Sequence, residues 1–382
     1  MLVRRKLCVV VAIAAVLLLM LASQSMQRRH ILPPRAHLNS RATASSRETV
    51  VEPTVAPAVL TPAPPPPSTM RPEADVEEME EEEEIEVEEE EQLVEDFQYL
   101  KPCDCSESCV SDLKGSAWFS QHYDPNQQPI LRAKNNNFDA DALAWWLGLQ
   151  RSDNDQTLEE VMIKMFQVIS PPTVETRRVP TRCRTCAVVG NSGNLQGSGH
   201  GKLINSHSFI IRMNKAVTRG FEKDVGNRTT HHFLYPESAV DVDHGVSLVL
   251  LPFKLRDLEW LTSALSTGHI KMTYMRVKDR VKADKDKVLV VNPVFFNYVH
   301  DRWTDHHGRY PSTGMLAIIF ALHTCDQVSV FGYGADKLGN WHHYWEDNRY
   351  AGAFRKTGVH SADFETKVIH TLAKEGKIKL YL

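Results

Sequence analysis

The chain has 382 residues and a formal net charge of −4, but its first hundred residues differ sharply in composition from the rest. They carry 9 basic and 18 acidic residues, which leaves residues 101–382 with 35 basic and 30 acidic residues and a net charge of +5. This balance suits an anionic ligand, but it is too small and too scattered to indicate a nucleic-acid partner.

An apolar run, LCVVVAIAAVLLLMLA, occupies residues 7–22 and follows three basic residues. We predict a cytosolic tail over residues 1–6 and a signal anchor over 7–23, because flanking basic residues stay in the cytosol. The run is shorter than the roughly 20 residues that an average bilayer needs, which suits a thinner early-secretory membrane. A signal peptide cleaved near Ala22 is the alternative, and either one delivers the chain to the secretory lumen.

Residues 24–100 are predicted to form a disordered, extended stem. They contain PAPPPPST and then EEMEEEEEIEVEEEEQ, and neither composition can bury enough apolar surface to fold. The acidic run would suit calcium or a basic partner as well as the more ordinary role of a solvated spacer. Residues 101–382 are predicted to form a single lumenal domain.

The cysteines indicate an oxidising compartment. Cys8 lies in the predicted anchor, and six cysteines remain in the lumenal part. The spacings CDCSESC and CRTC allow a four-thiolate zinc site, but an even number of cysteines in the secretory lumen favours three disulfides. A redox CxxC motif is disfavoured because Cys186 begins a predicted buried strand.

The pattern of the lumenal part predicts an α/β domain. Short β-rich apolar runs at 186–189, 208–213, 246–251, 288–291 and 328–331 are typical of a mostly parallel sheet covered by helices on both faces. A helix is predicted over 157–169, where Thr157 and Glu160 have the spacing of a capping box. A second helix, nearly all apolar, is predicted over 312–325.

Two segments are candidate phosphate sites. AVVGNSGNLQGSGHG, at 187–201, follows a predicted strand, but its glycines are not spaced as in a dinucleotide fingerprint and no acidic ribose ligand follows. Its asparagines could bind phosphate or ribose, whereas the simpler explanation is a structural turn. PSTG, at 311–314, begins the apolar helix. It is interpreted either as an anion site or as an ordinary N-cap.

Histidines and acidic residues do not indicate a metal site. His231–His232, His306–His307 and His342–His343 are adjacent pairs, and neighbouring side chains on a strand point to opposite faces. DVD, at 241–243, resembles a metal-binding DxD motif but has the surroundings of a surface turn. A histidine with a pKa near 6.5 would suit deprotonation of a hydroxyl. Aromatic residues near these segments would serve as core or as a sugar platform: Tyr235, Tyr274, Tyr310, Trp341, Tyr344 and Trp345.

Four segments, in order, resemble the motifs of the animal sialyltransferases (glycosyltransferase family 29). The large motif resembles CAVVGNSGNLQGSGHGKLINSHSFIIRMNKA, and the small motif resembles NPVFFNYVHDRWTDHHGRYPSTGMLAIIFALHTCDQV. The third is HHYW at 342–345, and the fourth is His360 with Glu365. YPES, HHGRYPSTG, GNWHHYW and AGAFRKTGVH are most similar to the β-galactoside α-2,3-sialyltransferases, types one and two. The resemblance extends from about Cys103 to the C-terminus.

The resemblance implies a Rossmann-like sheet of the variant GT-A type and an inverting enzyme. It implies transfer of sialic acid from CMP-sialic acid to the 3-hydroxyl of galactose in Galβ1,3GalNAc on glycoproteins or glycolipids. It also implies no metal and no cofactor. His360 resembles the general base, and His343 resembles the donor to the departing CMP phosphate.

Further site residues are implied only by the same resemblance. The donor CMP-sialic acid would be bound by Asn191, Ser192, Asn214, Ser312, Thr313, Gly314 and Gly334. The acceptor would be contacted by Gln150, Tyr235, Tyr274 and Tyr310. The implied disulfides are Cys103–Cys109, Cys105–Cys183 and Cys186–Cys325.

The resemblance also implies a single-pass type II protein of the Golgi membrane with a lumenal catalytic domain, and a secreted form after cleavage of the stem. The sequon at Asn227 permits glycosylation. Two alternatives are a catalytically silent glycan-binding protein on the same fold and a metal-dependent nucleotide-sugar transferase.

Overall fold

The computed structural model describes residues 110, 116–136, 138–149, 156–171, 183–335, 342–347 and 358–382. Within these ranges, no helix has the length and apolar character that crossing a membrane requires. The predicted anchor and stem lie outside the described residues, so both stay predictions.

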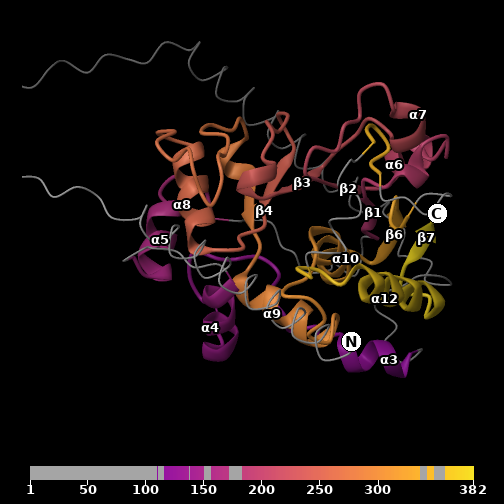
Figure 1. Ribbon diagram of the computed structural model, residues 1–382, viewed down its shortest axis with the longest axis horizontal. Coiled ribbons are helices and arrows are strands. Elements are labelled where there is room, and N and C mark those ends of the chain that lie inside the picture. The colour runs from indigo at the N-terminus through magenta and orange to yellow at the C-terminus, as the bar shows by residue number, and fades with distance from the viewer. Residues whose placement is uncertain are drawn as a thin grey trace, which may run out of the picture. The chain divides into compact units, whose positions relative to one another are not determined.

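Seven described strands form one sheet, in which every neighbouring pair is parallel. The spatial order is β5-β4-β3-β2-β1-β6-β7, and Figure 1 shows the strands from β4 to β7 in this order. The strands are β1 (Thr185–Val189), β2 (Phe209–Met213), β3 (His231–Leu234), β4 (Ser247–Leu250), β5 (Val288–Val290), β6 (Gln327–Phe331) and β7 (Lys379–Tyr381). The chain moves outward from β1 to β5 and then returns to the other side of β1. The order therefore reverses between β1 and β6, where ligands bind in open α/β sheets.

All five strands predicted from apolar runs are present, and the prediction of a mostly parallel sheet is confirmed. Two strands were not predicted. β3 begins with His231 and His232, which interrupt the apolar pattern, and the edge strand β7 has only three residues, none of them buried.

Both predicted helices are present, as α5 (Leu158–Met165) and α10 (Thr313–Thr324). The capping box is confirmed: the Thr157 hydroxyl accepts from the Glu160 amide at 3.3 Å, and the Thr157 amide donates to the Glu160 carboxylate at 2.8 Å. The other α-helices are α3 (Ala117–His122), α4 (Ala140–Leu149), α6 (Gly201–Asn205), α7 (Glu222–Val225), α8 (Leu255–Ala264), α9 (Pro293–Arg302) and α12 (Ala362–Lys374).

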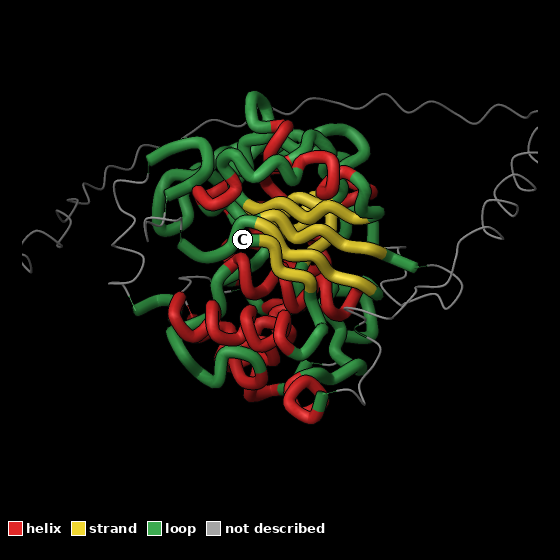
Figure 2. Tube along the Cα trace, turned by 90° about the vertical axis from the view of Figure 1, so that its right-hand side faces the viewer, coloured by secondary structure: helices red, strands yellow, loops and turns green. Residues whose placement is uncertain are grey.

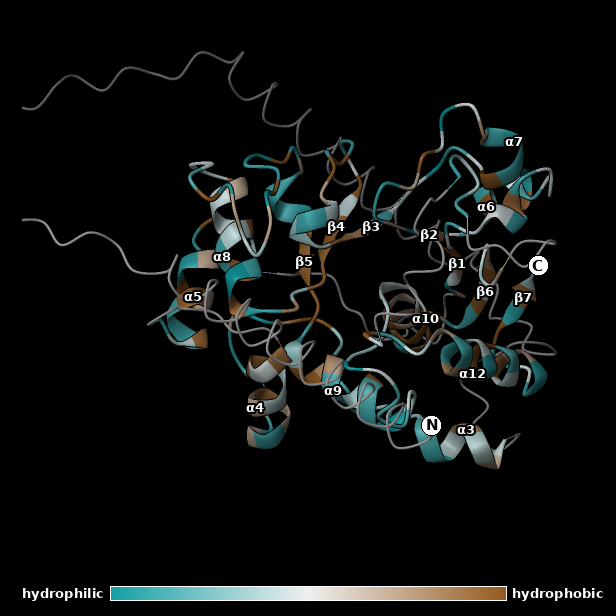
Figure 3. Cartoon of the chain, in the orientation of Figure 1, coloured by the Kyte–Doolittle hydropathy of each residue, from teal (hydrophilic) through white to brown (hydrophobic). Residues whose placement is uncertain are grey.

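Helices cover both faces of the sheet (Figure 2). One face, with Val188, Ile211 and Phe233, packs against α9, α10 and α12. On the opposite face, α5 and α8 pack on β4 and β5, and α6 and α7 pack on β1 and β2. The strands are accordingly apolar on both sides, as the brown β4 and β5 in Figure 3 show.

A disulfide joins Cys186 in β1 to Cys325, the residue after α10, as the resemblance implies. The Cα atoms are 6.0 Å apart, and the bond closes a sequence separation of 139 residues. In the chain-entropy description such a loop is worth about 5 kcal/mol. Cys183 is also in a disulfide, but Cys103, Cys105 and Cys109 lie outside the described residues, so Cys103–Cys109 and Cys105–Cys183 stay predictions.

Candidate active site

A cavity of about 290 Å³ opens at the carboxyl ends of the central strands. Its walls come from the loops after β1, β2, β3 and β6, the first residues of α10, and two segments near the C-terminus. The size and the place are those of a small-ligand site at the switch point of a parallel sheet. The lining residues are Gly190, Asn191, Ser192, Met213, Asn214, Tyr235, Ser312, Thr313, Gly314, Gly332, Tyr333, Gly334, His342, His343 and His360.

Gly190 allows the loops after β1 and β6 to meet. A methyl group at this position would come within 2.2 Å of the Gly332 carbonyl oxygen. The Gly190 amide donates to Phe331 at 2.7 Å, and the Ser192 amide donates to Gly332 at 3.1 Å. Only the first part of the glycine-rich segment lines the cavity, because the amides of Gly197 and Gly199 bind Asp224 instead. The segment therefore does not form one continuous phosphate loop.

Two asparagines present unpaired amide oxygens to the cavity. The Asn191 side-chain amino group donates to the Met213 carbonyl at 3.1 Å, which fixes the amide orientation. Asn214 has φ of 59°, and its backbone carbonyl accepts from His232 Nε2 at 2.6 Å. In the part of the chain that the structure describes, neither Oδ1 atom has a donor, although both are buried. Ligand hydroxyl or amino groups, such as those of a nucleoside, would satisfy these acceptors.

Ser312 begins α10 and is held by Glu365. The Ser312 hydroxyl donates to Oε2 of Glu365 at 2.5 Å, its amide donates to Oε1 at 2.8 Å, and its Oγ accepts from the Met315 amide. The N-cap interpretation of this segment is confirmed for Ser312, and the buried Glu365 carboxylate takes both of its hydrogens. Burial raises the pKa of Glu365 to about 7, and the two bonds from Ser312 oppose that rise.

The amides of Thr313 and Gly314 are suited to binding an anion at this turn. They are the first two in α10, so they have no acceptor inside the helix, and both residues line the cavity. The positive end of the helix dipole favours an anion at this place. The bonds of Ser312 to Glu365 and Met315 fix the turn that presents these amides.

His360 has the geometry of a general base. Nδ1 donates to the Tyr310 carbonyl at 2.9 Å, so in the neutral ring the lone pair is on Nε2. Burial lowers the pKa of His360, and the bond to Tyr310 partly offsets that shift. The Arg309 amide donates to the Val359 carbonyl at 2.7 Å, which fixes the segment before His360 against the small motif.

His343 has a different environment. Its Nδ1 lies 3.0 Å from the Glu346 carboxylate, and its ring stacks on Trp345 with centroids 4.5 Å apart. The Glu346 carboxylate holds the imidazole ring in this orientation. The Tyr344 amide donates to the Asn191 carbonyl at 3.1 Å, so this segment is attached to the loop after β1.

Three tyrosines gather beside the cavity. Phe253 contacts both Tyr235 and Tyr310, with ring centroids 5.7 and 5.0 Å apart, and Tyr310 packs edge-on against His360 at 5.0 Å. Burial raises the pKa of Tyr274 to about 12, and Glu237, Tyr235 and Tyr310 add to the rise. Thr273, beside Tyr274, donates to Glu237 in the turn after Tyr235, so the loop that holds Tyr274 lies next to that turn. Gln150, the fourth predicted acceptor contact, lies outside the described residues.

Other residues singled out from the sequence have structural roles. His231 stacks on Phe209, and burial lowers its pKa to about 4. His307 stacks on Phe364 at 3.7 Å. Tyr344 is buried, and its hydroxyl donates to the Val217 carbonyl at 2.6 Å.

The acidic DVD segment lies on the surface, where Asp241 pairs with Lys278 at 2.7 Å. Among the described residues, no group of three or more His, Cys, Asp or Glu side chains is placed to hold a metal ion. Asn227 is exposed, its Oδ1 accepts from Asn205 at 2.8 Å, and its glycosylation stays a prediction. Trp341 lies outside the described residues.

Sequence reasoning missed several supporting residues. His232, which holds Asn214, was noticed only as half of a histidine pair, and Glu365, which holds Ser312, was noticed only as part of a motif. Glu237 was noticed only as part of YPES, and Lys254 was not singled out. Only Lys254 lacks any local signal, because nothing in the sequence indicates that it is buried.

The fold and the cavity define a class: an α/β enzyme domain whose ligand site lies at the switch point of a parallel sheet. The family model of glycosyltransferase family 29 (sialyltransferase) matches residues 130–377. The chain belongs to this family.

Relatives of known name cover most of the family region. A rat protein, CMP-N-acetylneuraminate-beta-galactosamide-alpha-2,3-sialyltransferase 2, is 56% identical over 290 residues, which are 76% of this chain and 83% of the relative. A human protein, CMP-N-acetylneuraminate-beta-galactosamide-alpha-2,3-sialyltransferase 1, is 50% identical over 284 residues, which are 74% of this chain and 83% of the relative.

Solved structures agree with the family assignment. A mammalian sialyltransferase crystal structure has a TM-score of 0.68 and 47% identity, covering 74% of this chain and 99% of its own. A second, in complex with Gal-beta-1-3GalNAc-ortho-nitrophenol, has the same TM-score and 48% identity, covering 73% and 99% of the two chains.

Proposed function

We propose that this protein transfers sialic acid from CMP-sialic acid to the 3-hydroxyl of the terminal galactose in Galβ1,3GalNAc glycans. The observation that carries the proposal is one cavity that gathers two asparagines, the start of α10, His343 and His360. The names of the relatives and the disaccharide in a similar structure support the choice of donor and acceptor.

The proposed chemistry is a single displacement with inversion. His360 Nε2 takes the proton of the galactose 3-hydroxyl, while the oxygen of that hydroxyl forms a bond to the anomeric carbon of sialic acid. The bond from that carbon to the phosphate oxygen breaks, and its electron pair leaves with CMP. His343 donates to the departing phosphate, and the amides of Thr313 and Gly314 stabilise the charge that develops there.

The donor supplies a leaving group that is already a stabilised phosphate. One hydrogen-bond donor and a helix N-terminus are enough to accept its charge, so we propose that the reaction needs neither a metal ion nor a cofactor. Burial lowers the pKa of His360, which favours the neutral ring that a base in a mildly acidic lumen needs.

The proposal includes the Golgi membrane as the site of action. The apolar run at 7–22 with its basic flank supports a type II anchor, and the buried Cys186–Cys325 bond supports an oxidising lumen. Glycoproteins and glycolipids that end in Galβ1,3GalNAc are the proposed acceptors, and a secreted form would follow cleavage in the stem.

Transfer by the purified full-length chain tests the proposal. The chain is given CMP-sialic acid, EDTA, and Galβ1,3GalNAc, Galβ1,4GlcNAc or GalNAc, and the product linkage is determined by NMR. We expect transfer to the 3-position of the first acceptor. Loss of transfer in EDTA would indicate a metal-dependent transferase. Binding of CMP and disaccharide without any transfer would indicate the glycan-binding alternative.

A further inference from the structure

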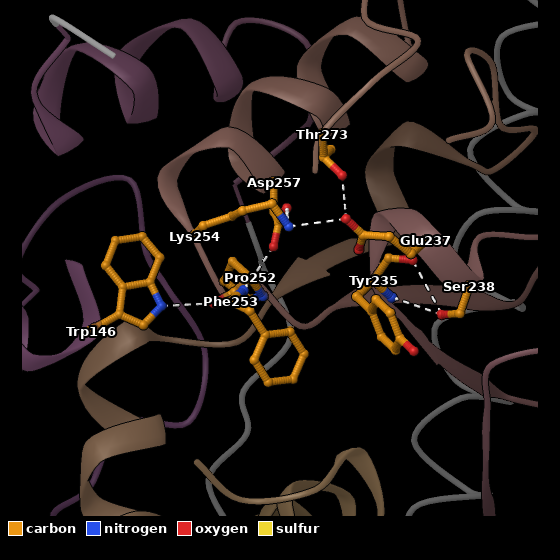
Figure 4. A network of polar contacts seen from close by, with 9 residues as sticks. All are labelled: Trp146, Tyr235, Glu237, Ser238, Pro252, Phe253, Lys254, Asp257 and Thr273. Atoms are coloured by element: carbon orange, nitrogen blue, oxygen red, sulfur yellow. Dashed lines mark hydrogen bonds and ion pairs between the residues drawn. The ribbon is translucent and has the colours of Figure 1, made fainter. Parts of the chain in front are cut away.

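A buried network of three charged side chains, Glu237, Lys254 and Asp257, lies beside Tyr235 (Figure 4). The Lys254 ammonium is 3.1 Å from the Glu237 carboxylate and 2.7 Å from that of Asp257. Their side chains are only 5%, 5% and 0% exposed. Burying such a group is costly, and apolar side chains of similar volume often stabilise a fold equally well. Stability alone therefore does not account for the network.

The network joins three segments that are distant in sequence. Glu237 lies in the turn Pro236–Ser238, directly after Tyr235, while Lys254 and Asp257 lie at the start of α8. Asp257 also accepts from the Phe253 amide at 2.9 Å. The third segment is the loop 271–276, whose Thr273 hydroxyl donates to the same Glu237 oxygen that Lys254 binds.

The loop 271–276 presents Tyr274 at its tip. Met272 and Arg276 form an antiparallel bridge, and the Thr273 amide donates to the Met275 carbonyl at 2.9 Å. Tyr274 is 67% exposed, but the Lys254 ammonium lies 5.0 Å from the centroid of its ring. A desolvated ammonium at this distance attracts the ring face. The exposed tyrosine is thus oriented from below by a buried charge.

We propose that Lys254 is a positioning residue for the acceptor: with Glu237 and Thr273 it holds Tyr274 toward Tyr235 and Tyr310, and so sets acceptor affinity. The inference rests on the proposed function, in which Tyr274 contacts the acceptor glycan. Lys254 does not line the cavity that holds the proposed donor site, so we expect it to affect the acceptor and not the donor.

Kinetics of the full-length enzyme test the inference. Lys254→Met is expected to raise the acceptor KM roughly three- to thirtyfold and to leave the donor KM within about twofold. Thr273→Val, which keeps all three charges, is expected to raise the acceptor KM roughly three- to tenfold. Lys278→Met, which removes the exposed ammonium beside Asp241, and Thr262→Val, in the middle of α8, are the matched controls and should change neither KM.

A double-mutant cycle separates positioning from a general loss of structure. Lys254→Met combined with Tyr274→Ala should raise the acceptor KM no further than Tyr274→Ala alone. Additive effects, or equal changes in both KM values, would overturn the inference. If Lys254→Met fails to fold, Thr273→Val decides in the same cycle.

Direct binding keeps this test independent of catalysis. The affinity for Galβ1,3GalNAc is measured by NMR titration in the presence of CMP, for the same set of variants. If the wild-type protein transfers no sialic acid but binds the disaccharide, and Lys254→Met weakens that binding, the proposed function is refuted and the positioning role is supported. If the wild-type protein transfers sialic acid and Lys254→Met leaves the affinity for the disaccharide unchanged, the proposed function is supported and the positioning role is refuted.

Discussion

The two sides of the site are built differently. The proposed donor side consists mostly of backbone and amide groups at the ends of β1, β2 and β6 and at the start of α10. The proposed acceptor side consists of tyrosines on loops beside a buried ionic network. Tight backbone packing leaves little freedom on the donor side, whereas substitutions of a few side chains can reshape the acceptor side. A family with one nucleotide donor and several acceptors would diversify on the second side.

The largest expected effect is at His360, where the two sides meet. His360→Ala should lower kcat by at least about a hundredfold, because no other group would take the acceptor proton. CMP affinity, measured by calorimetry, should change less than about twofold. His244→Ala, which removes an exposed histidine beside Asp284, is the control. Near-normal turnover of the His360 variant would show that another residue is the base.

The rigidity of the donor side can be tested at Gly190. Gly190→Ala should lower the free energy of unfolding by at least about 2 kcal/mol and weaken CMP binding, because the methyl group meets the Gly332 carbonyl at 2.2 Å. Gly148→Ala, in α4 with no atom within 4 Å of the added methyl, should stabilise the protein by about 0.5–1 kcal/mol. Thermal unfolding measures both, and equal values would contradict the argument.

The turn at α10 offers a smaller effect. Ser312→Ala removes the N-cap and the link to Glu365, so the donor KM should rise roughly fivefold while the acceptor KM stays within about twofold. Ser116→Ala removes the same kind of cap from α3, where the Phe119 amide bonds the serine at 3.0 Å. That control should lose stability and keep its donor KM. An unchanged donor KM in Ser312→Ala would show that this turn does not contribute to donor binding.

The smallest effect concerns pH. The base must be neutral, and burial places the folded-state pKa of His360 below its usual 6.5. Activity should therefore persist below pH 6.5 and fall only as the pH passes through the lowered pKa. The free energy of unfolding should change in the same direction. The contribution of His360 is present above pH 6.5 and is lost as the pH falls through its lowered pKa. A pH profile of kcat whose acid limb lies above 6.5 would contradict this environment.

Local pattern predicted much of the fold. The runs that became β1, β2, β4, β5 and β6 are apolar on both faces, and the α5 capping box joins residues only three apart. β3 was missed because it begins with two histidines, which are polar and only half-buried and therefore break the apolar pattern. The four motifs predicted most of the site, and the structure places ten of the implied donor, acceptor and catalytic residues around one cavity.

The sequence by itself determined the elements, the family and the residue types of the site, because these depend on neighbours along the chain and on motif order. Tertiary structure decided what each residue does. Ser312 meets Glu365 across 53 residues, His360 meets the Tyr310 carbonyl across 50, and Thr273 meets Glu237 across 36. Such contacts set which hydrogens are committed and which charges are buried. They arise only when the sheet brings distant loops to one edge.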